Sequence, residues 1–251
     1  MTEIDAVVHG ANELVVGPDE GGRGLETVEG GALAVVDGTV AAVGPTDEVV
    51  REYPPENAAR AVDASGRAVL PGFVDPHTHA LFAGDRSDEF AAKLRGKSYQ
   101  DILAEGGGIL RTVRAVRDAG EETLLANLLG HLDTMLAHGT TTVEVKSGYG
   151  LDAETELRML RVIDRADDAH PVDVVPTFMG AHAVPEGRDA DEYVEAVVDE
   201  QLPAVESQGI AEFCDVFCEE GVFSVAQSRR VLEAGRDAGR SEEHTSELQS
   251  Q

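Results

Sequence analysis

The sequence has few basic residues and very few lysines. Lysine and arginine together number 20 against 48 acidic residues, and the formal net charge is −28. This balance excludes electrostatic binding to nucleic acid or anionic lipid as a main function. The acidic residues are spread along most of the chain, so they form a solvated surface and not an acidic tail. Such a surface is typical of salt-adapted proteins, because dissolved ions screen the repulsion between the charges.

Tryptophan is absent, and Cys214 and Cys218 are the only cysteines. A scaffold held together by several disulfides is therefore excluded, and we expect two buried core thiols in a reducing compartment. No apolar run approaches the ~18 residues of a membrane helix, and no signal-peptide pattern opens the chain. The apolar fraction of 42% still supplies ample material for a core. These features predict a soluble cytoplasmic protein that binds neither nucleic acid nor membrane.

Residues 4–66 predict a small antiparallel β unit. Short apolar segments follow one another there, and Asp37–Gly38 separates two of them, a dipeptide typical of tight hairpin turns. The region is too small to close a hydrophobic core of its own. We therefore expect it to be one part of a larger β structure.

From Ala68 the pattern changes to apolar strands separated by amphipathic helices. The strand candidates are residues 68–74, 140–145, 172–178 and 213–217. The clearest helix repeats leucines on one face from Leu124 to Leu136 and stops at Gly139. Two more helices have good N-caps, one at Asp152 and one at Ser224, which begins a Ser-x-x-Gln capping box.

Four strand–helix repeats make half of a (β/α)₈ TIM barrel. A doubly wound α/β sheet would normally show a glycine-rich phosphate turn after its first strand, and none follows residues 68–74. A phosphate cradle at Gly106–Gly108 is a weaker alternative. The sequence therefore predicts an α/β fold of the barrel type, with its chemistry at the carboxyl ends of the strands.

The first candidate strand ends in Asp-Pro-His-Thr-His, which includes His77 and His79. Residues i and i+2 of a strand point to the same face, so the two imidazoles can converge on one metal ion. The alternative is a pair of surface histidines at the entry of a loop, which leaves their place at a strand end unexplained. We interpret His77 and His79 as metal ligands.

The segment from Leu70 to His79 resembles the first-strand motif of the amidohydrolase superfamily. This resemblance implies a metal-bearing (β/α)₈ barrel joined to a small β-sandwich that both chain termini build. It accordingly implies a β-sandwich part at residues 1–67 and the first four βα units of a barrel, truncated to about its first half, at residues 68–240.

Three further segments, residues 80–86, 144–151 and 176–182, together resemble the imidazolonepropionases of that superfamily. The resemblance implies one Zn²⁺ or Fe ion and the substrate 4-imidazolone-5-propanoate, which water opens to N-formimidoyl-L-glutamate in histidine degradation. It implies that His77 and His79 bind the metal and that Arg86, Tyr149 and His182 contact the substrate. His182 would also stabilise the oxyanion that develops on the reacting carbonyl.

Elementary chemistry fits these assignments. A planar guanidinium such as that of Arg86 can hold a propionate carboxylate through two parallel hydrogen bonds, although a solvated pair with Asp85 or Asp88 is the alternative. Tyr149 lies between two glycines, which allow the backbone to approach a ligand closely, and otherwise it is a turn aromatic. Lys146 stands on the second strand, so we interpret it as structural and not as a carboxylated lysine that bridges two metals.

The end of the chain departs from this pattern. The superfamily supplies a third histidine after the fifth strand and an aspartate after the eighth, and neither can be matched, so the general base too would lie beyond residue 240. His244 and Glu247 have the spacing of a family motif, but no apolar strand precedes them. We interpret residues 241–251 as a foreign tail on a truncated reading frame.

Two other functions stay open. One is a different amidohydrolase that acts on a cyclic amide or a nucleobase, such as a deaminase. The other, from a different class, is a non-catalytic metal-binding fragment of such an enzyme. The sequence favours neither Zn²⁺ nor Fe, because imidazole and carboxylate ligands suit both. The expected partners are a small-molecule substrate, water and a second copy of the chain in a homodimer.

Overall fold

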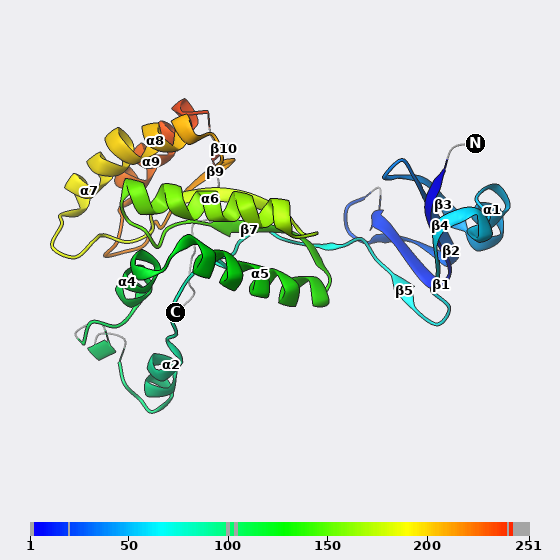
Figure 1. Ribbon diagram of the computed structural model, residues 1–251, viewed down its shortest axis with the longest axis horizontal. Coiled ribbons are helices and arrows are strands. Elements are labelled where there is room, and N and C mark those ends of the chain that lie inside the picture. Colours follow the sequence, from blue (N-terminus) through cyan, green and yellow to red (C-terminus); the bar gives the residue numbers. More distant parts are fainter. Residues whose placement is uncertain (1–2, 20, 99–100, 103–104, 240, 243–251) are drawn as a thin grey trace. The chain divides into compact units, whose positions relative to one another are not determined.

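A computed structural model describes residues 3–19, 21–98, 101–102, 105–239 and 241–242. The chain divides after Gly72 into two units, residues 1–72 and 73–251 (Figure 1). The first unit contains β1 (Ile4–Pro18), β2 (Leu25–Val36), β3 (Thr39–Pro45), α1 (Thr46–Glu52), the 3₁₀ turn η1 (Pro55–Asn57), β4 (Ala58–Asp63) and β5 (Ala68–Val69).

The predicted hairpin is confirmed between β2 and β3. Asp37 and Gly38 both have positive φ, 51° and 71°, as a tight turn between two right-twisted strands requires, and Val36 pairs with Thr39 across it. The strand order is β3-β2-β1-β4, with β5 also paired to β1. A small core of Val7, Ala32, Ala34 and Val49 lies between this sheet and α1.

The expectation of a purely antiparallel unit was wrong. β4 and β5 run parallel to β1, with Ile4 opposite Ala58 and Glu13 opposite Ala68. The reason is the connection, because α1 and η1 carry the chain back to the starting end of β1 before β4 begins. A tight turn can join antiparallel strands only, whereas a crossover of this length allows parallel pairing.

The second unit alternates strands with helices. It contains β6 (Phe73–Asp75), α2 (Ser87–Leu94), α4 (Ile109–Asp118), α5 (Glu121–Ala137), β7 (Thr140–Lys146), α6 (Ala153–Ala169), β8 (Asp173–Ala181), α7 (Ala190–Ala196), the π-helical turn η2 (Val197–Gln201), α8 (Leu202–Gln208), β9 (Phe213–Val216), α9 (Val225–Asp237) and β10 (Ser241–Glu242).

These strands form one parallel sheet in the order β10-β9-β8-β7-β6. Figure 1 shows the long helices α5 and α6 lying along the sheet, and α5 contacts β7, α6 contacts β8 and α9 contacts β9. The predicted α/β architecture of successive βα units, a curled half-barrel, is thus confirmed. Its core includes Val143, Val145, Phe178 and Leu160.

One expected strand is divided in two. Residues 68–74 were expected to form a single strand, but Ala68 and Val69 pair with β1 in the first unit, whereas Phe73 begins β6 in the second. Pro71 and Gly72 stand between them. Proline has no N–H to donate to a sheet, and glycine disfavours a strand interior, so the ladder ends there.

The predicted helix signals are confirmed. Leu124, Leu128 and Leu132 of α5 have no exposed surface, and Gly139 follows the helix with a φ of 96°. The Asp152 side chain accepts a hydrogen bond from the Thr155 N–H at 2.8 Å, which caps α6. Ser224 and Gln227 form both hydrogen bonds of the capping box at α9.

Cys214 and Cys218 are both free thiols. Cys214 is buried as expected, whereas Cys218 lies past the end of β9 and is only partly buried. Ser241 and Glu242 pair with Phe213 and Cys214 as β10, and the family-like His244 and Glu247 lie outside the described residues.

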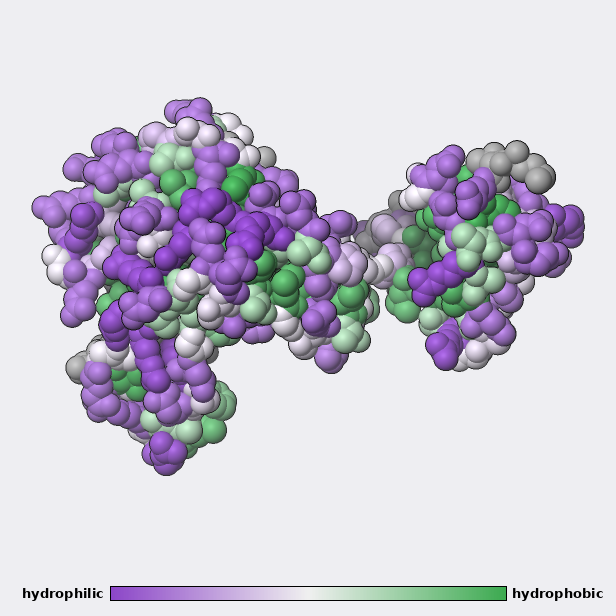
Figure 2. Space-filling view, viewed as in Figure 1, coloured by the Kyte–Doolittle hydropathy of each residue, from purple (hydrophilic) through white to green (hydrophobic). Residues whose placement is uncertain are grey.

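Hydrophilic residues cover much of the visible face of each unit, as the acidic composition predicts (Figure 2). Among the described residues, the helices are too short or too polar to cross a membrane.

Candidate active site

Four of the five site residues expected from the sequence lie together beyond the ends of three neighbouring strands. His77 and His79 follow β6, Tyr149 follows β7 and His182 follows β8. The ring centroids of His77 and His79 are 5.5 Å apart, and those of His79 and His182 are 4.5 Å apart with the rings stacked at 13°. Tyr149 lies 5.2 Å from His182 and 5.8 Å from His79. We call these four side chains the ring cluster.

The position of the cluster follows from the sheet. The carboxyl ends of parallel strands lie at one edge, which is where the loops of an α/β protein place their functional side chains. Thr78, between the two histidines, is tied to β7: its hydroxyl donates to the Glu144 carbonyl at 2.6 Å, and its carbonyl accepts from the Lys146 N–H at 3.0 Å. These bonds fix the backbone from which His77 and His79 project.

Burial keeps two of these imidazoles neutral. It lowers the pKa of His79 to about 3, with further lowering by His182, His77 and Lys146. It lowers the pKa of His182 to about 4, although the hydrogen bond to Gly148 acts in the opposite direction. The Nδ1 atom of His79 is buried and has no hydrogen-bond partner among the described residues. A neutral imidazole nitrogen with a free lone pair is the form that binds a metal.

The tautomer of His182 is set by its backbone partner. Its Nδ1 lies 3.0 Å from the Gly148 carbonyl oxygen. A carbonyl can only accept a hydrogen bond, so Nδ1 carries the proton of the neutral ring and Nε2 keeps a lone pair. In this state Nε2 accepts a hydrogen bond, and donation to an oxyanion would require the protonated ring, which burial opposes.

Arg86 is the fifth expected residue, and its charge reaches the cluster. Burial raises the pKa of Tyr149, and the positive charge of Arg86 partly offsets this rise. The guanidinium does not pair with Asp85 or Asp88. Its Nε donates instead to Oε2 of Glu89 at 2.9 Å, while 40% of the Arg86 side chain stays exposed.

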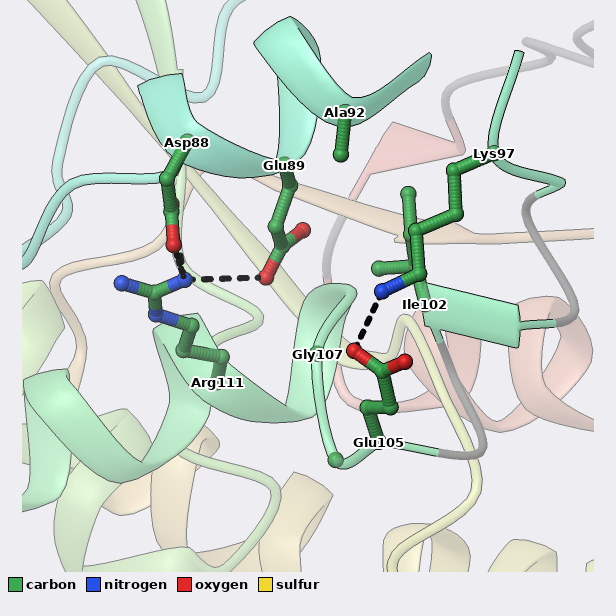
Figure 3. A pocket seen from close by; sticks show the side chains of 9 residues that line it. Asp88, Glu89, Ala92, Lys97, Ile102, Glu105, Gly107 and Arg111 are labelled. Atoms are coloured by element: carbon green, nitrogen blue, oxygen red, sulfur yellow. Dashed lines mark hydrogen bonds and ion pairs between the residues drawn. The ribbon is translucent and has the colours of Figure 1, made fainter. Parts of the chain in front are cut away.

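Glu89 joins Arg86 to the glycine-rich turn. Both of its carboxylate oxygens lie 3.2 Å from the Gly108 N–H, and Oε1 lies 3.4 Å from Nη1 of Arg111. Glu89 and Arg111 line a cavity of about 330 Å³. Figure 3 shows both side chains on its wall, together with the ion pair of Lys97 and Glu105. Because a carboxylate already accepts the Gly108 N–H, the geometry disfavours a phosphate cradle at this turn.

Lys146 is fully buried between two carboxylates. Its Nζ lies 2.5 Å from Oε1 of Glu144 and 3.0 Å from Oδ2 of Asp215. An ammonium held in this way favours the structural interpretation of Lys146. Sequence reasoning missed Asp215 and Glu144, although Glu144 stands two residues before Lys146 on the same strand, so that both side chains share one face.

Sequence reasoning also missed Glu156, the most deeply buried acid near the cluster. Its carboxylate accepts the N–H groups of Gly148, Gly150 and Leu151 at 2.8, 2.7 and 2.9 Å. The available signal was weak, because a glutamate in the first turn of a helix usually needs no explanation beyond the helix dipole.

A metal ion fits the two histidines, and they supply only part of its ligands. They converge from positions i and i+2, and the neutral His79 ring has a buried nitrogen without a hydrogen-bond partner. Within the part of the chain that the structure describes, no group of three or more His, Cys, Asp or Glu side chains is placed to hold a metal. Among the described residues, His77 and His79 are therefore the two ligands that we assign to a metal.

The comparison with known families agrees with this fold. The family model described as "Amidohydrolase family" matches residues 60–220, and the chain belongs to this family, whose members are metal-dependent. A second model, "Imidazolonepropionase-like composite domain, bacteria", matches residues 31–55.

Individual proteins also match this chain at high sequence identity. The imidazolonepropionase of Haloarcula marismortui is 84% identical over 239 residues, which cover 95% of this chain and 57% of the relative. The imidazolonepropionase of Halobacterium salinarum is 70% identical over 239 residues, which again cover 95% of this chain and 57% of the relative. The chain thus spans a little over half the length of these relatives. Its acidic composition fits the haloarchaeal source of both.

A solved structure supports the fold. Ochratoxinase of A. niger has a TM-score of 0.60 and 17% identity, over 96% of this chain and 55% of that one. At this identity the likeness concerns the fold alone.

Proposed function

We propose that this chain is part of an imidazolonepropionase, which hydrolyses 4-imidazolone-5-propanoate to N-formimidoyl-L-glutamate in histidine degradation. The observation that carries the proposal is the ring cluster at the carboxyl edge of β6, β7 and β8, with the charge of Arg86 acting on Tyr149. The identity of 84% to the Haloarcula marismortui enzyme supports the particular substrate.

In this proposal His77 and His79 hold one Zn²⁺ or Fe ion. When bound, the metal supplies a polarised water and a polarised lactam carbonyl. The residues described here do not complete its ligand set, and the third histidine, the aspartate and the general base belong to sequence outside residues 1–240. Lys146 lies between Glu144 and Asp215 and has a structural role in this proposal.

The other three residues bind the organic substrate. Arg86 holds the propionate carboxylate with a charge-assisted pair, and Glu89 fixes the direction of its guanidinium. Tyr149 contacts the ring from the loop after β7. His182 accepts an N–H of the imidazolone ring at Nε2, because its own Nδ1–H is engaged by Gly148. This assignment replaces oxyanion stabilisation as the proposed role of the neutral His182.

The domain assignment is likewise a proposal. Residues 1–67 would form one part of a composite β-sandwich, residues 68–240 the first half of a barrel, and residues 241–251 a tail foreign to the enzyme. We further propose that the enzyme works in the cytoplasm, in keeping with two free thiols, and that a homodimer is its assembly.

The test uses a completed chain: residues 1–240 followed by the C-terminal segment of the Haloarcula marismortui relative that lies beyond the matched region. Loaded with Zn²⁺ or Fe²⁺ in molar KCl, it is offered 4-imidazolone-5-propanoate and a panel of nucleobases. We expect hydrolysis of the imidazolone and none of the nucleobases. Deamination of a nucleobase would assign another amidohydrolase, and stoichiometric metal without turnover would support a non-catalytic metal-binding protein.

Metal analysis locates the site independently of turnover. His79→Ala should lower the metal content of the completed chain, whereas His138→Ala, at the exposed end of α5, should leave it unchanged. Equal metal content in both variants would remove His79 from the ligand set.

A further inference from the structure

The carboxylate of Glu156 organises the loop after β7. Glu156 is in the first turn of α6 and has no exposed surface. Oε2 accepts the Gly148 N–H at 2.8 Å, and Oε1 accepts the N–H groups of Gly150 and Leu151 at 2.7 and 2.9 Å. Three backbone donors on both sides of Tyr149 thus converge on one side chain.

The loop conformation is suited to this contact. Leu151 has a φ of 57°, in the left-handed region that residues with a side chain rarely adopt, and its N–H is one of the three donors. A Cβ on Gly150 would lie 2.8 Å from Oε1 of Glu156 and 2.7 Å from its backbone nitrogen. Glycine at position 150 is therefore what allows the backbone to reach the carboxylate.

The same loop holds His182. The Gly148 N–H donates a hydrogen bond to Glu156, and the Gly148 carbonyl accepts a hydrogen bond from His182 Nδ1–H, with Nδ1 and the oxygen 3.0 Å apart. A Cβ on Gly148 would lie 2.9 Å from that Nδ1, so the glycine also allows the close approach of the imidazole. The peptide groups on either side of Gly148 thus connect the carboxylate of Glu156 to the orientation of His182.

We propose that Glu156 is a positioning residue of the substrate site: through the Gly148–Leu151 backbone it fixes the place of Tyr149 and the Nδ1–H tautomer of His182, and so selects a substrate that donates an N–H to Nε2. The inference rests on the proposed function for its substrate.

A carboxylate is required, and an amide would not serve. Both oxygens of Glu156 accept hydrogen bonds, and each has its own backbone donors. A glutamine in the same place would turn its NH₂ group toward at least one of these N–H groups and leave that donor buried without an acceptor. Burial raises the pKa of Glu156, while the hydrogen bonds from the Ser147 side chain and the loop backbone act in the opposite direction.

The test compares Glu156→Gln with Glu154→Gln in the completed chain. Glu154 lies on the same helix two residues earlier and is exposed, so it is the matched control. Selective ¹⁵N labelling of histidine reports which ring nitrogen of His182 carries the proton. We expect the wild type and Glu154→Gln to show the Nδ1–H form alone. Glu156→Gln should show both tautomers and a fall of about tenfold or more in kcat/KM.

Each outcome decides the proposal. A folded Glu156→Gln protein that keeps the single His182 tautomer overturns the proposal. This holds even if turnover falls, because the loss of activity would then not arise from the tautomer of His182. If Glu156→Gln does not fold, Glu156→Asp replaces it. Its carboxylate is one methylene too short to reach all three N–H groups, so both His182 tautomers are again expected. A second His182 tautomer with reduced kcat/KM supports the proposal, and an unchanged spectrum overturns it.

The spectrum also separates this inference from the proposed function. The tautomer of His182 can be read in a protein that does not hydrolyse 4-imidazolone-5-propanoate. Failure of the substrate assay with an intact Glu156 effect would reject the substrate and keep the positioning role.

Discussion

The guanidinium of Arg86 and the carboxylate of Glu89 form a hydrogen-bonded ion pair, with Nε 2.9 Å from Oε2, across the start of α2. Glu89 is nearly buried, whereas Arg86 keeps 40% of its side chain exposed. The hydrogen bond from Nε to Glu89 therefore fixes the orientation of the guanidinium. The exposed part of the side chain is available to an anion. This arrangement is what a carboxylate clamp requires.

Arg86→Ala should raise KM for 4-imidazolone-5-propanoate in the completed chain. Loss of a charge-assisted contact costs about 1.5–3 kcal/mol, or roughly 10- to 150-fold in KM. Metal content should not change. Arg95→Ala, at the exposed end of α2, is the control, and steady-state kinetics make the measurement. An unchanged KM in Arg86→Ala would remove this residue from the site.

Glu89 should contribute to stability against acid. Burial raises its pKa, but hydrogen bonds from Arg86 and the Gly108 N–H outweigh burial, so the pKa lies below the usual 4.5. A carboxyl whose pKa is lowered by folding stabilises the protein above its unfolded-state pKa and loses that effect as the pH falls. Between about pH 5 and pH 3, the wild type should therefore lose more urea resistance than Glu89→Gln. Equal losses in the two proteins would contradict this account, and Glu154→Gln should behave as the wild type.

The leucine face of α5 should carry much of the core energy. Leu128 has no exposed surface, so Leu128→Ala should lower the free energy of unfolding by about 2–5 kcal/mol. Leu125, on the same helix, is only partly buried, so Leu125→Ala should lower the free energy of unfolding clearly less. Urea denaturation of the two variants makes the comparison. A similar loss at both positions would show that the described face of the helix is not the one that packs.

Salt should stabilise the protein. The net charge of −28 means that acidic side chains repel one another across the surface. The screening length of this repulsion is about 10 Å at 0.1 M salt but only about 3 Å at 1 M. The Tm should consequently rise from low to molar KCl. A non-ionic osmolyte at matched water activity is the control, because it is excluded from the protein surface but does not screen charge. A Tm that is flat or falls with KCl would contradict a stabilising role for charge screening.

Much of the site could be predicted because strand ends coincide in a parallel sheet. His77, Tyr149 and His182 stand far apart in the sequence, yet each follows an apolar strand, and that alone places them at one edge. The hairpin at Asp37–Gly38 and the caps at Asp152 and Ser224 could be predicted because their bonds are local.

The remaining features depend on contacts through space. Nothing near Glu156 in the sequence indicates that its carboxylate binds a loop five to eight residues earlier, and Asp215 meets Lys146 only because β7 and β9 flank β8. The parallel pairing of β4 follows from where the crossover returns the chain. Such contacts follow from the assembled sheet, and periodicity in one segment carries no signal of them.

The most direct test of the ring cluster as the site of imidazolone hydrolysis is one assay of four proteins: the completed chain, its His79→Ala and His138→Ala variants, and the 251-residue chain. Release of N-formimidoyl-L-glutamate from 4-imidazolone-5-propanoate is measured with metal in molar KCl. The account predicts turnover by the completed chain and by His138→Ala, and none by His79→Ala or by the 251-residue chain, which offers two imidazole ligands among its described residues. Full turnover by His79→Ala would contradict it.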